Sequence, residues 1–420
     1  ASAGSVSAMR VLPPAALRAL CTFAAFSFVR VATPAWCGRD AEAWYTGNPE
    51  VTHGLAAEVL AFEEEDLRIR HDAPKDRYTG EWALVTHQMI ALGLGQLIVA
   101  NPADRPRYAA PLRAAALRSF LPEMRDFGTE AWDGEDALSN LSSSHGHAYL
   151  AYAALAVGMA RWLDPSGFPA SVARDHDALI AAYERRLLEA PNAIIETYPG
   201  QAFPTDIAAV AAAIAMHGRA TGADHRKVLL HWVSGVRKAQ IDPASGFVHQ
   251  RLQTNGQPLD VPRGSGTGLA TYYASFVDGP LTRDLTDALA REERTFAGFG
   301  AIGEFVPLPA NSPLAKRPYG HGDIDSGPVI FGVSVAATGF SLAPLRNGFH
   351  DGTGRNHDAF VRVFRTTSLF GMPATLGTGG ATRFRSGGPI GNALLFAMLT
   401  ARPLPILDEQ VRRAREEVRP

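Results

Sequence analysis

The sequence predicts one all-helical domain, an (α/α)6 barrel in which six helical hairpins form a toroid. Apolar segments of helical periodicity follow one another along the chain, punctuated by Gly and Pro, without the strand and helix alternation typical of a parallel sheet. Every second segment is apolar on nearly all sides and rich in Ala and Gly. Such helices must be buried all round, so they predict an inner ring inside an outer one.

The pattern predicts twelve helices. They lie near residues 53–70, 81–100, 106–126, 145–163, 172–190, 205–221, 224–240, 265–277, 281–298, 325–341, 354–370 and 388–401. The even-numbered ones, such as 145–163, form the inner ring, and the odd-numbered ones, such as 172–190, carry a charged face. Between the seventh and eighth, residues 247–262 contain Asn255-Gly256 between extended-looking residues, which predicts a short β-hairpin insertion.

The chain divides into three predicted parts: an arm over 1–50, the barrel over 51–402 and a charged tail over 403–420. In the arm, Met9 and Arg10 precede the apolar run Leu20–Val29, an order that resembles a secretory signal. We therefore expect an extracytoplasmic location, periplasmic or secreted, with the N-terminus close to a membrane. Arg30 interrupts the run, and ten apolar residues are too few to span a bilayer.

Composition narrows the range of partners. The 420 residues carry a formal net charge of −2 with acids and bases interspersed, and no basic stripe predicts nucleic-acid binding. The two cysteines show no zinc-type spacing, so the sequence predicts neither a metal nor a cofactor. The expected partner is a small-molecule or carbohydrate substrate. The sequence leaves open whether the protein forms a homo-oligomer.

Polar residues gather where the predicted inner helices begin. Six helices that all run in the same direction bring their first residues to one rim, where we expect a shared polar site. The residues that we assign to it are Tyr78 and Glu81, His145 and His147, Glu196, Tyr198 and Asp206, Arg263, and Asp323 and Asp325. Asp and Ser are also common helix caps, which explains one residue at each start but not paired acids or paired histidines.

Carboxylates and imidazoles together form an acid–base set. We assign catalysis to Asp206, His147, Asp325 and Glu196, and substrate binding to Tyr78, Glu81, His145, Tyr198, Arg263 and Asp323. A neighbouring carboxylate raises the pKa of an acid, so Glu196 near Asp206, or Asp323 beside Asp325, would supply a proton donor. His217, near the end of the sixth helix, is interpreted as a helix C-terminal residue.

From His145 to about Ser275 the chain resembles the linalool dehydratase/isomerase family. The resemblance rests on Gly146-His147 before an apolar helix, on the segment APNAIIETYPGQAFPTDIAAVA and on IDPASGF. It implies an (α/α)6 barrel, a periplasmic location and cofactor-independent dehydration or isomerisation, with His147 as a pocket residue. The positions that match the family's two catalytic cysteines hold Glu196 and Thr205 here, so no thiol is present. The resemblance therefore implies the location of the site more firmly than it implies linalool as the substrate.

Two chemistries stay open at this stage, together with a non-catalytic binding role. The first is a hydro-lyase or isomerase acting on a small hydroxylated substrate, in which an acid protonates a leaving hydroxyl and a base removes a proton. The second is a glycoside hydrolase or sugar epimerase that uses paired carboxylates. The aromatic residues that would bind a sugar are Trp132, Tyr198, Phe203 and Tyr319.

Overall fold

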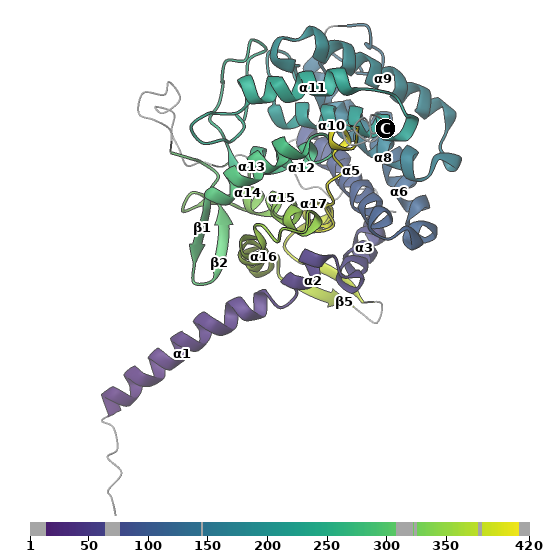
Figure 1. Ribbon diagram of the computed structural model, residues 1–420. Coiled ribbons are helices and arrows are strands. Elements are labelled where there is room, and N and C mark those ends of the chain that lie inside the picture. Colours follow the sequence, from purple (N-terminus) through teal and green to yellow (C-terminus); the bar gives the residue numbers. More distant parts are fainter. Residues whose placement is uncertain are drawn as a thin grey trace, which may run out of the picture.

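The computed structural model describes residues 14–63, 76–143, 146–307, 322, 326–376 and 380–410. Six of its helices form an inner ring. These are α5 (Asp76–Ala100), α8 (Ala151–Leu163), α10 (Pro204–Thr221), α12 (Gly264–Ala274), α14 (Val335–Phe340) and α17 (Gly388–Leu399). Each packs against the next, and α17 packs against α5, so the ring closes between its last and first members (Figure 1).

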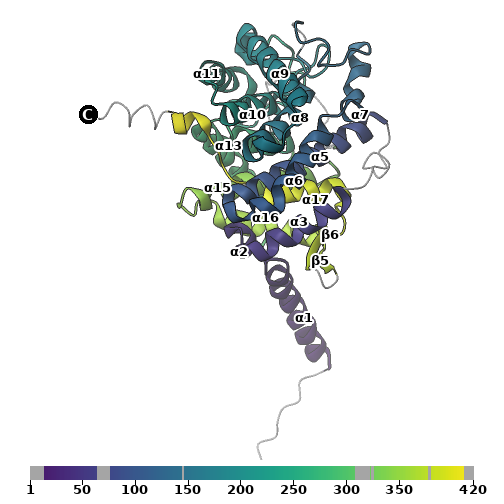
Figure 2. The same cartoon turned by 90° about the vertical axis from the view of Figure 1, so that its right-hand side faces the viewer.

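An outer helix precedes each inner one. The outer helices are α3 (Pro49–Glu63), α6 (Arg105–Ser119), α9 (Ala170–Glu189), α11 (Arg226–Gly235), α13 (Gly279–Arg291) and α16 (His357–Gly371). They are amphipathic: α13 buries Leu281, Leu285 and Leu289 against the inner ring and exposes charged residues. Figure 2 shows the same arrangement from the side, with α9 and α11 on the part of the body remote from α2 and α3. The predicted all-helical toroid is confirmed.

Small residues let the inner helices approach one another closely. α10 is buried continuously from Ile207 to Gly218. On α5, a Cβ at Gly93 would lie 2.4 Å from the ring of Phe396 on α17, so only glycine fits there. The segment Thr79–Ala100 is also long and apolar enough to cross a membrane, but 83% of its most apolar stretch is buried inside the protein, as in a core helix.

Polar aromatic residues pack between the inner helices α5, α8 and α12. Tyr152 on α8 and Tyr273 on α12 are both buried, with ring centroids 5.9 Å apart. The amide of Gln88 donates to the Tyr273 hydroxyl over 3.2 Å. Buried polar groups of different inner helices therefore hydrogen-bond to one another.

Two predicted helices are shorter than expected because hairpins replace one of their ends. The helix predicted over 281–298 ends at Arg291, and β1 (Glu293–Phe296) then pairs antiparallel with β2 (Phe299–Ile302). Ala297 and Gly298 turn this hairpin with φ of +49° and +86°, as a two-residue turn requires. The helix predicted over 325–341 begins only at Val335, after β3 (Val329–Ile330) and β4 (Val333–Ser334).

The predicted hairpin at 247–262 forms isolated bridges instead of regular strands. Leu252 pairs with both Ala202 and Pro258, and His249 pairs with Pro262. Gly256 has a φ of +89°, so a turn is present, and the residues on its two sides pair with each other; Leu252 pairs in addition with Ala202 of another loop. A third short sheet, β5 (Pro373–Leu376) with β6 (Ala381–Phe384), joins α16 to α17.

The two ends of the described chain differ from the predicted arm and tail. Residues 14–37 form one long helix, α1 (Pro14–Cys37), which leaves the body before α2 (Ala41–Thr46) returns to it (Figure 1). At the other end, Leu404 and Leu407 are buried and their amides donate to the carbonyls of Ser275 and Val277. Residues 403–410 therefore belong to the body and not to a separate tail.

The remaining α-helices of the described residues are α7 (Pro122–Arg125) and α15 (Leu342–His350).

Candidate functional site

Asp206 lies in the first turn of α10, at the centre of the predicted polar rim. The Tyr152 hydroxyl donates to its Oδ1, and the Thr197 hydroxyl donates to its Oδ2 over 2.7 Å. α10 begins after Phe203 and has no side-chain cap, so the carboxylate does not serve the helix end. Asp206 is therefore not a helix cap. Its two hydrogen bonds join α10 to α8 and to the segment before α10.

The environment of Asp206 favours its neutral form. Burial raises the pKa of the carboxyl, and the hydrogen bonds from Tyr152 and Thr197 offset this only in part. Among the described residues, no Lys or Arg contributes to the shift. The residue as a whole is half-buried. The carboxyl of Asp206 therefore holds its proton to a higher pH than usual, which is the property that a general acid needs.

Glu81 supplies a second carboxylate near Asp206. Its negative charge contributes to the raised pKa of Tyr152, together with burial and the charge of Asp206, so both acids act on the same phenol. Glu81 is half-buried near the start of α5, whereas Ala83 and Leu84 are fully buried. Its charge acts on Tyr152, the phenol that donates to Asp206.

His147 belongs to the wall of the site and is not exposed to it. It has a left-handed φ of +44°, and its ring is fully buried at a centroid distance of 4.2 Å from Trp132. The Trp132 indole donates to the carbonyl of Thr197 over 3.2 Å, and Thr197 donates to Asp206. His147 thus supports Asp206 through two intermediates. A catalytic role for its ring in direct contact with substrate does not match this position.

Glu196 has a local role. Its Oε1 accepts a hydrogen bond from the amide of Gly200 over 2.9 Å, which closes the turn between Thr197 and Gln201. Neighbouring residues of an extended segment point in opposite directions, so Thr197 reaches Asp206 while Glu196 does not. The predicted pairing of Glu196 with Asp206 is therefore wrong, and the raised pKa of Asp206 has burial as its cause.

A buried carboxylate that the sequence did not reveal lies at the start of α12. Glu304 is fully buried and accepts hydrogen bonds from the hydroxyls of Ser265, over 2.7 Å, and Ser334, over 2.6 Å. Burial raises its pKa, and these hydrogen bonds lower it in part. Arg263, a predicted binding residue, contributes a positive charge and pairs with Asp260 over 3.3 Å. Glu304 thus ties α12 to the cap of α14.

These contacts show that the inner-helix starts converge. Thr205 on α10 donates to the carbonyl of Gly266 on α12 over 3.1 Å, next to Ser265 and Glu304. With Tyr152 bound to Asp206 and Glu81 acting on Tyr152, the starts of five inner helices are linked. The last inner helix differs: near its start, Arg383 turns outward and pairs with Glu58 on α3.

Aromatic side chains surround the Asp206 end. Tyr198 and Phe203 are half-buried, and their ring centroids lie 6.4 Å apart. Tyr198 also stacks on the buried Tyr149 at 6.2 Å. Trp132, predicted as a sugar platform, is only 5% exposed and packs on His147 instead. His145, Tyr319, Asp323, Asp325 and the side chain of Tyr78 lie outside the described residues.

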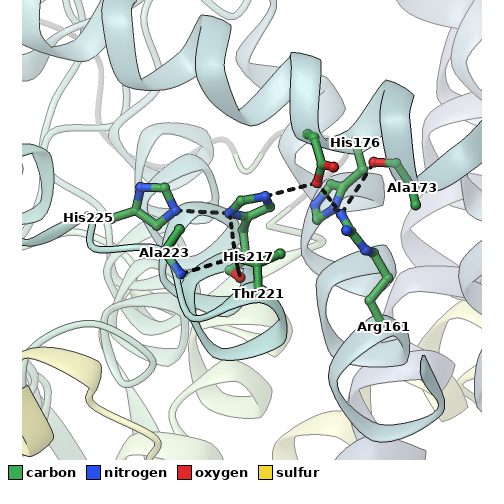
Figure 3. A network of polar contacts seen from close by, with 8 residues as sticks. Arg161, Ala173, His176, His217, Thr221, Ala223 and His225 are labelled. Atoms are coloured by element: carbon green, nitrogen blue, oxygen red, sulfur yellow. Dashed lines mark hydrogen bonds and ion pairs between the residues drawn. The ribbon is translucent and has the colours of Figure 1, made fainter.

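A second polar cluster lies at the opposite end of α10 and is shown in Figure 3. Asp177 on α9 accepts hydrogen bonds from Arg161 and from Nε2 of His217 over 3.0 Å. Arg161 also donates to Nδ1 of His176 over 2.8 Å. Burial first, and then the charges of His217 and Arg161, lower the pKa of His176 to about 3, so this imidazole is neutral. His217 lies near the end of α10, as predicted, and its side chain also connects α10 to α9 through Asp177.

The same cluster extends to His225, the residue before α11. His217 Nδ1 lies 2.9 Å from Nε2 of His225, whose Nδ1 lies 3.2 Å from the carboxylate of Glu184. Burial lowers the pKa of His217, and the hydrogen bond to Asp177 opposes this in part. Burial therefore favours the neutral imidazole of His217, which can donate to Asp177 from Nε2 and accept from His225 at Nδ1.

A cavity of about 280 Å³ lies apart from both clusters, between α13, α15 and the segment 403–408. Arg283, Asp287, His350, Arg355 and Asp408 are among its lining residues, and none of the predicted site residues lines it. Within the described ranges, no group of three or more His, Cys, Asp or Glu residues is placed to hold a metal ion.

The sequence matches no family model and no curated protein. Among solved structures, the chain is similar to a Clostridium acetobutylicum glycoside hydrolase from family 105, with 11% identity over 82% of this chain and 97% of that one, at a TM-score of 0.46. It is also similar to a polysaccharide lyase, with 11% identity over 87% of this chain and 99% of that one, at the same TM-score of 0.46.

Proposed function

We propose that this protein is an acid–base enzyme that acts on a hydroxylated, carbohydrate-type substrate at the N-terminal end of its inner helices. The observation that carries the proposal is the state of Asp206: a half-buried residue whose carboxyl pKa is raised by burial and whose two oxygens accept hydrogen bonds from hydroxyl groups. A carboxyl with a raised pKa keeps its proton to a higher pH than usual and is suited to donate it to a leaving oxygen.

Glu81 completes the proposed chemistry as the base. Its charge acts on the same phenol as that of Asp206, from an inner helix next to α8, and a pair of carboxyl groups is the usual acid and base of glycoside hydrolysis. In a hydrolase, Glu81 would activate water. In a lyase or an epimerase, it would remove a proton from carbon. Tyr198 and Phe203 would hold the sugar ring by stacking.

The second candidate is dehydration or isomerisation of a small apolar alcohol, as the resemblance to linalool dehydratase/isomerase implies. The half-buried rings of Tyr198 and Phe203 favour an apolar substrate as well as a sugar. In this reaction Asp206 would protonate the leaving hydroxyl, and Glu81 would again take the proton from carbon. His147, which is buried behind Trp132, would support the wall in either reaction.

A two-stage experiment separates these candidates. A thermal-shift screen first compares oligosaccharides, including uronic-acid oligomers, with terpene alcohols. The compound that stabilises the protein is then tested as a substrate for the wild type, Asp206→Asn and Glu196→Gln. We expect Asp206→Asn to lose activity and Glu196→Gln to keep it, because Glu196 only closes its own turn. Equal activity of all three proteins would remove Asp206 from the mechanism.

A further inference from the structure

We propose that the face from which α1 leaves the body is a membrane-binding surface for an anionic phospholipid bilayer. Three elements meet on it: α1, the tip of the β1–β2 hairpin and the end of α16. Residue contacts place them together. The α-carbon of Gly298, at the hairpin tip, is close to Pro34 of α1, and Arg365 of α16 donates to the Gly298 carbonyl over 3.0 Å.

Large apolar side chains are exposed on each of these elements. On α1, Phe23, Val31 and Trp36 are 69%, 72% and 70% exposed. At the hairpin tip Phe296 is 85% exposed. Scattered apolar residues are ordinary on a protein surface, but a group of them around one projecting helix marks an interaction site.

The end of α16 continues the same apolar group. Phe370 and Met372 are 61% and 56% exposed, and the exposed Arg385 follows them on the neighbouring strand, its amide 3.5 Å from the Met372 carbonyl. Arginine beside exposed apolar side chains fits the boundary between acyl chains and anionic headgroups.

The sequence of α1 fits a lipid environment better than a protein groove. Arg18 and Arg30 are exposed and flank a stretch that contains no charged residue, about 16 Å long at the rise of a helix. Long arginine side chains extend toward the headgroups from such positions. At the base of the helix the guanidinium of Arg39 lies 4.4 Å from the Trp36 ring, and tryptophan is typical of the membrane interface.

Four acidic residues of this face each lie beside a basic one, and Asp358 shares His357 with Glu42. Arg18, Arg30 and Arg385 are exposed and are the residues that we expect to attract anionic lipid. Glu293 binds Arg362 of α16 over 2.6 Å, and Glu42 binds His357 over 2.8 Å. Asp40 lies 3.4 Å from Arg39. The predicted electrostatic attraction therefore weakens with salt, whereas the apolar part of the binding does not.

Co-flotation of the full chain with vesicles tests the proposal. We expect the protein to float with phosphatidylcholine vesicles that contain phosphatidylglycerol, and to float less with phosphatidylcholine alone. The variant F296S/F370S/M372S keeps α1 and should lower vesicle affinity by roughly tenfold or more, because three apolar side chains no longer enter the bilayer. The variant F23E/V31E, on α1, should abolish binding.

Leu230→Ser is the matched control, since Leu230 is 57% exposed on α11, remote from α1. It should float like the wild type, and circular dichroism should show the same helix content in every variant. A full chain that stays unbound, or an equal loss in Leu230→Ser, would overturn the proposal. So would a dimer in solution that F296S/F370S/M372S converts to a monomer without any vesicle binding, because a second copy would then cover this face.

Discussion

The two ends of α10 lie beside two carboxylates that are stabilised in different ways: Asp177 is exposed on α9, and Asp206 is half-buried on α10 itself. At the C-terminal end, burial favours the neutral form of Asp177, but hydrogen bonds from Arg161 and His217 outweigh it and lower the pKa. At the N-terminal end, Asp206 contacts two hydroxyl groups, and its pKa is raised by burial. A carboxylate that is paired with cations holds helices together. One that is not paired costs stability and remains available for proton transfer.

The largest expected effect is that of Asp206→Asn on activity. We expect the rate on the identified substrate to fall by about 10²–10⁴-fold, the usual contribution of a general acid. The pKa of Asp206 is raised in the folded state, so its stabilising contribution is present at low pH and is lost as the pH rises through that pKa. Asp206→Asn should therefore unfold at the same temperature as the wild type, or higher, at pH 7.

Asp177→Asn tests the opposite end with the same chemical change. Its pKa is lowered in the folded state, so the ionised form stabilises the fold at neutral pH. The variant should unfold at a lower temperature while its activity is retained. Loss of activity in Asp177→Asn without loss of stability would contradict the assignment of stability to the C-terminal end of α10 and of activity to its N-terminal end.

Removal of His217 should have the next largest effect, and on stability alone. His217→Ala deletes the hydrogen bonds to Asp177 on α9 and to His225 at the start of α11, and the buried His225 loses its partner at Nε2. We expect the free energy of unfolding to fall by about 1–3 kcal/mol, measured by urea denaturation. An unchanged unfolding midpoint would show that the cluster does not join the three helices.

The pH dependence of stability sharpens the comparison further. The pKa of His176 is about 3 in the folded protein, below its value of about 6.5 in the unfolded chain. The unfolded chain therefore binds the proton more readily, and stability falls as the pH drops from about 6.5 toward 3, by up to about 1.4 kcal/mol per pH unit. His176→Gln should show a smaller loss between pH 6 and pH 5 in urea denaturation at both values.

The smallest expected effect is a displaced pH profile. The Tyr152 hydrogen bond lowers the pKa of Asp206, so Tyr152→Phe should raise that pKa further. The pH at which kcat/KM depends on Asp206 should move to higher values, with a modest change in the maximal rate. Phe fits the position because it differs from Tyr only by the hydroxyl group. A pH profile identical to that of the wild type would show that the Tyr152 hydroxyl does not influence the reacting carboxyl.

The inner ring could be predicted because its helices are marked in the sequence itself. The Ala-rich stretch that begins at Ile207 is apolar on every side, and Pro204 and Gly222 bracket it, so both the helix and the position of Asp206 followed. The hairpin at 293–302 could not be predicted in the same way. Its first residues continue the charged pattern of α13, and the Ala297-Gly298 turn is a weaker signal than Asn-Gly.

The site was predicted less completely than the fold, since its contacts are set by loops. Glu196 and Thr197 are adjacent, and the sequence does not say which of them faces Asp206. Glu304 has no pattern of spacing, although one signal was available: it is a lone acid between Ile302 and Val306 in an apolar stretch. A single charged residue in such a stretch can be buried only when other residues form hydrogen bonds to it. Here the donors, Ser265 and Ser334, lie elsewhere in the sequence.

The packing of α17 on α5 joins residues about three hundred positions apart in the sequence and has a consequence for biosynthesis. A ribosome that has released residues up to α12 has already delivered Asp206, Tyr152 and Glu81, but the toroid is still open on one side. Contacts between such distant segments form slowly, because a long loop must close first. The ring is therefore completed only after the last hairpin has been made, when the residues around Asp206 have long left the ribosome.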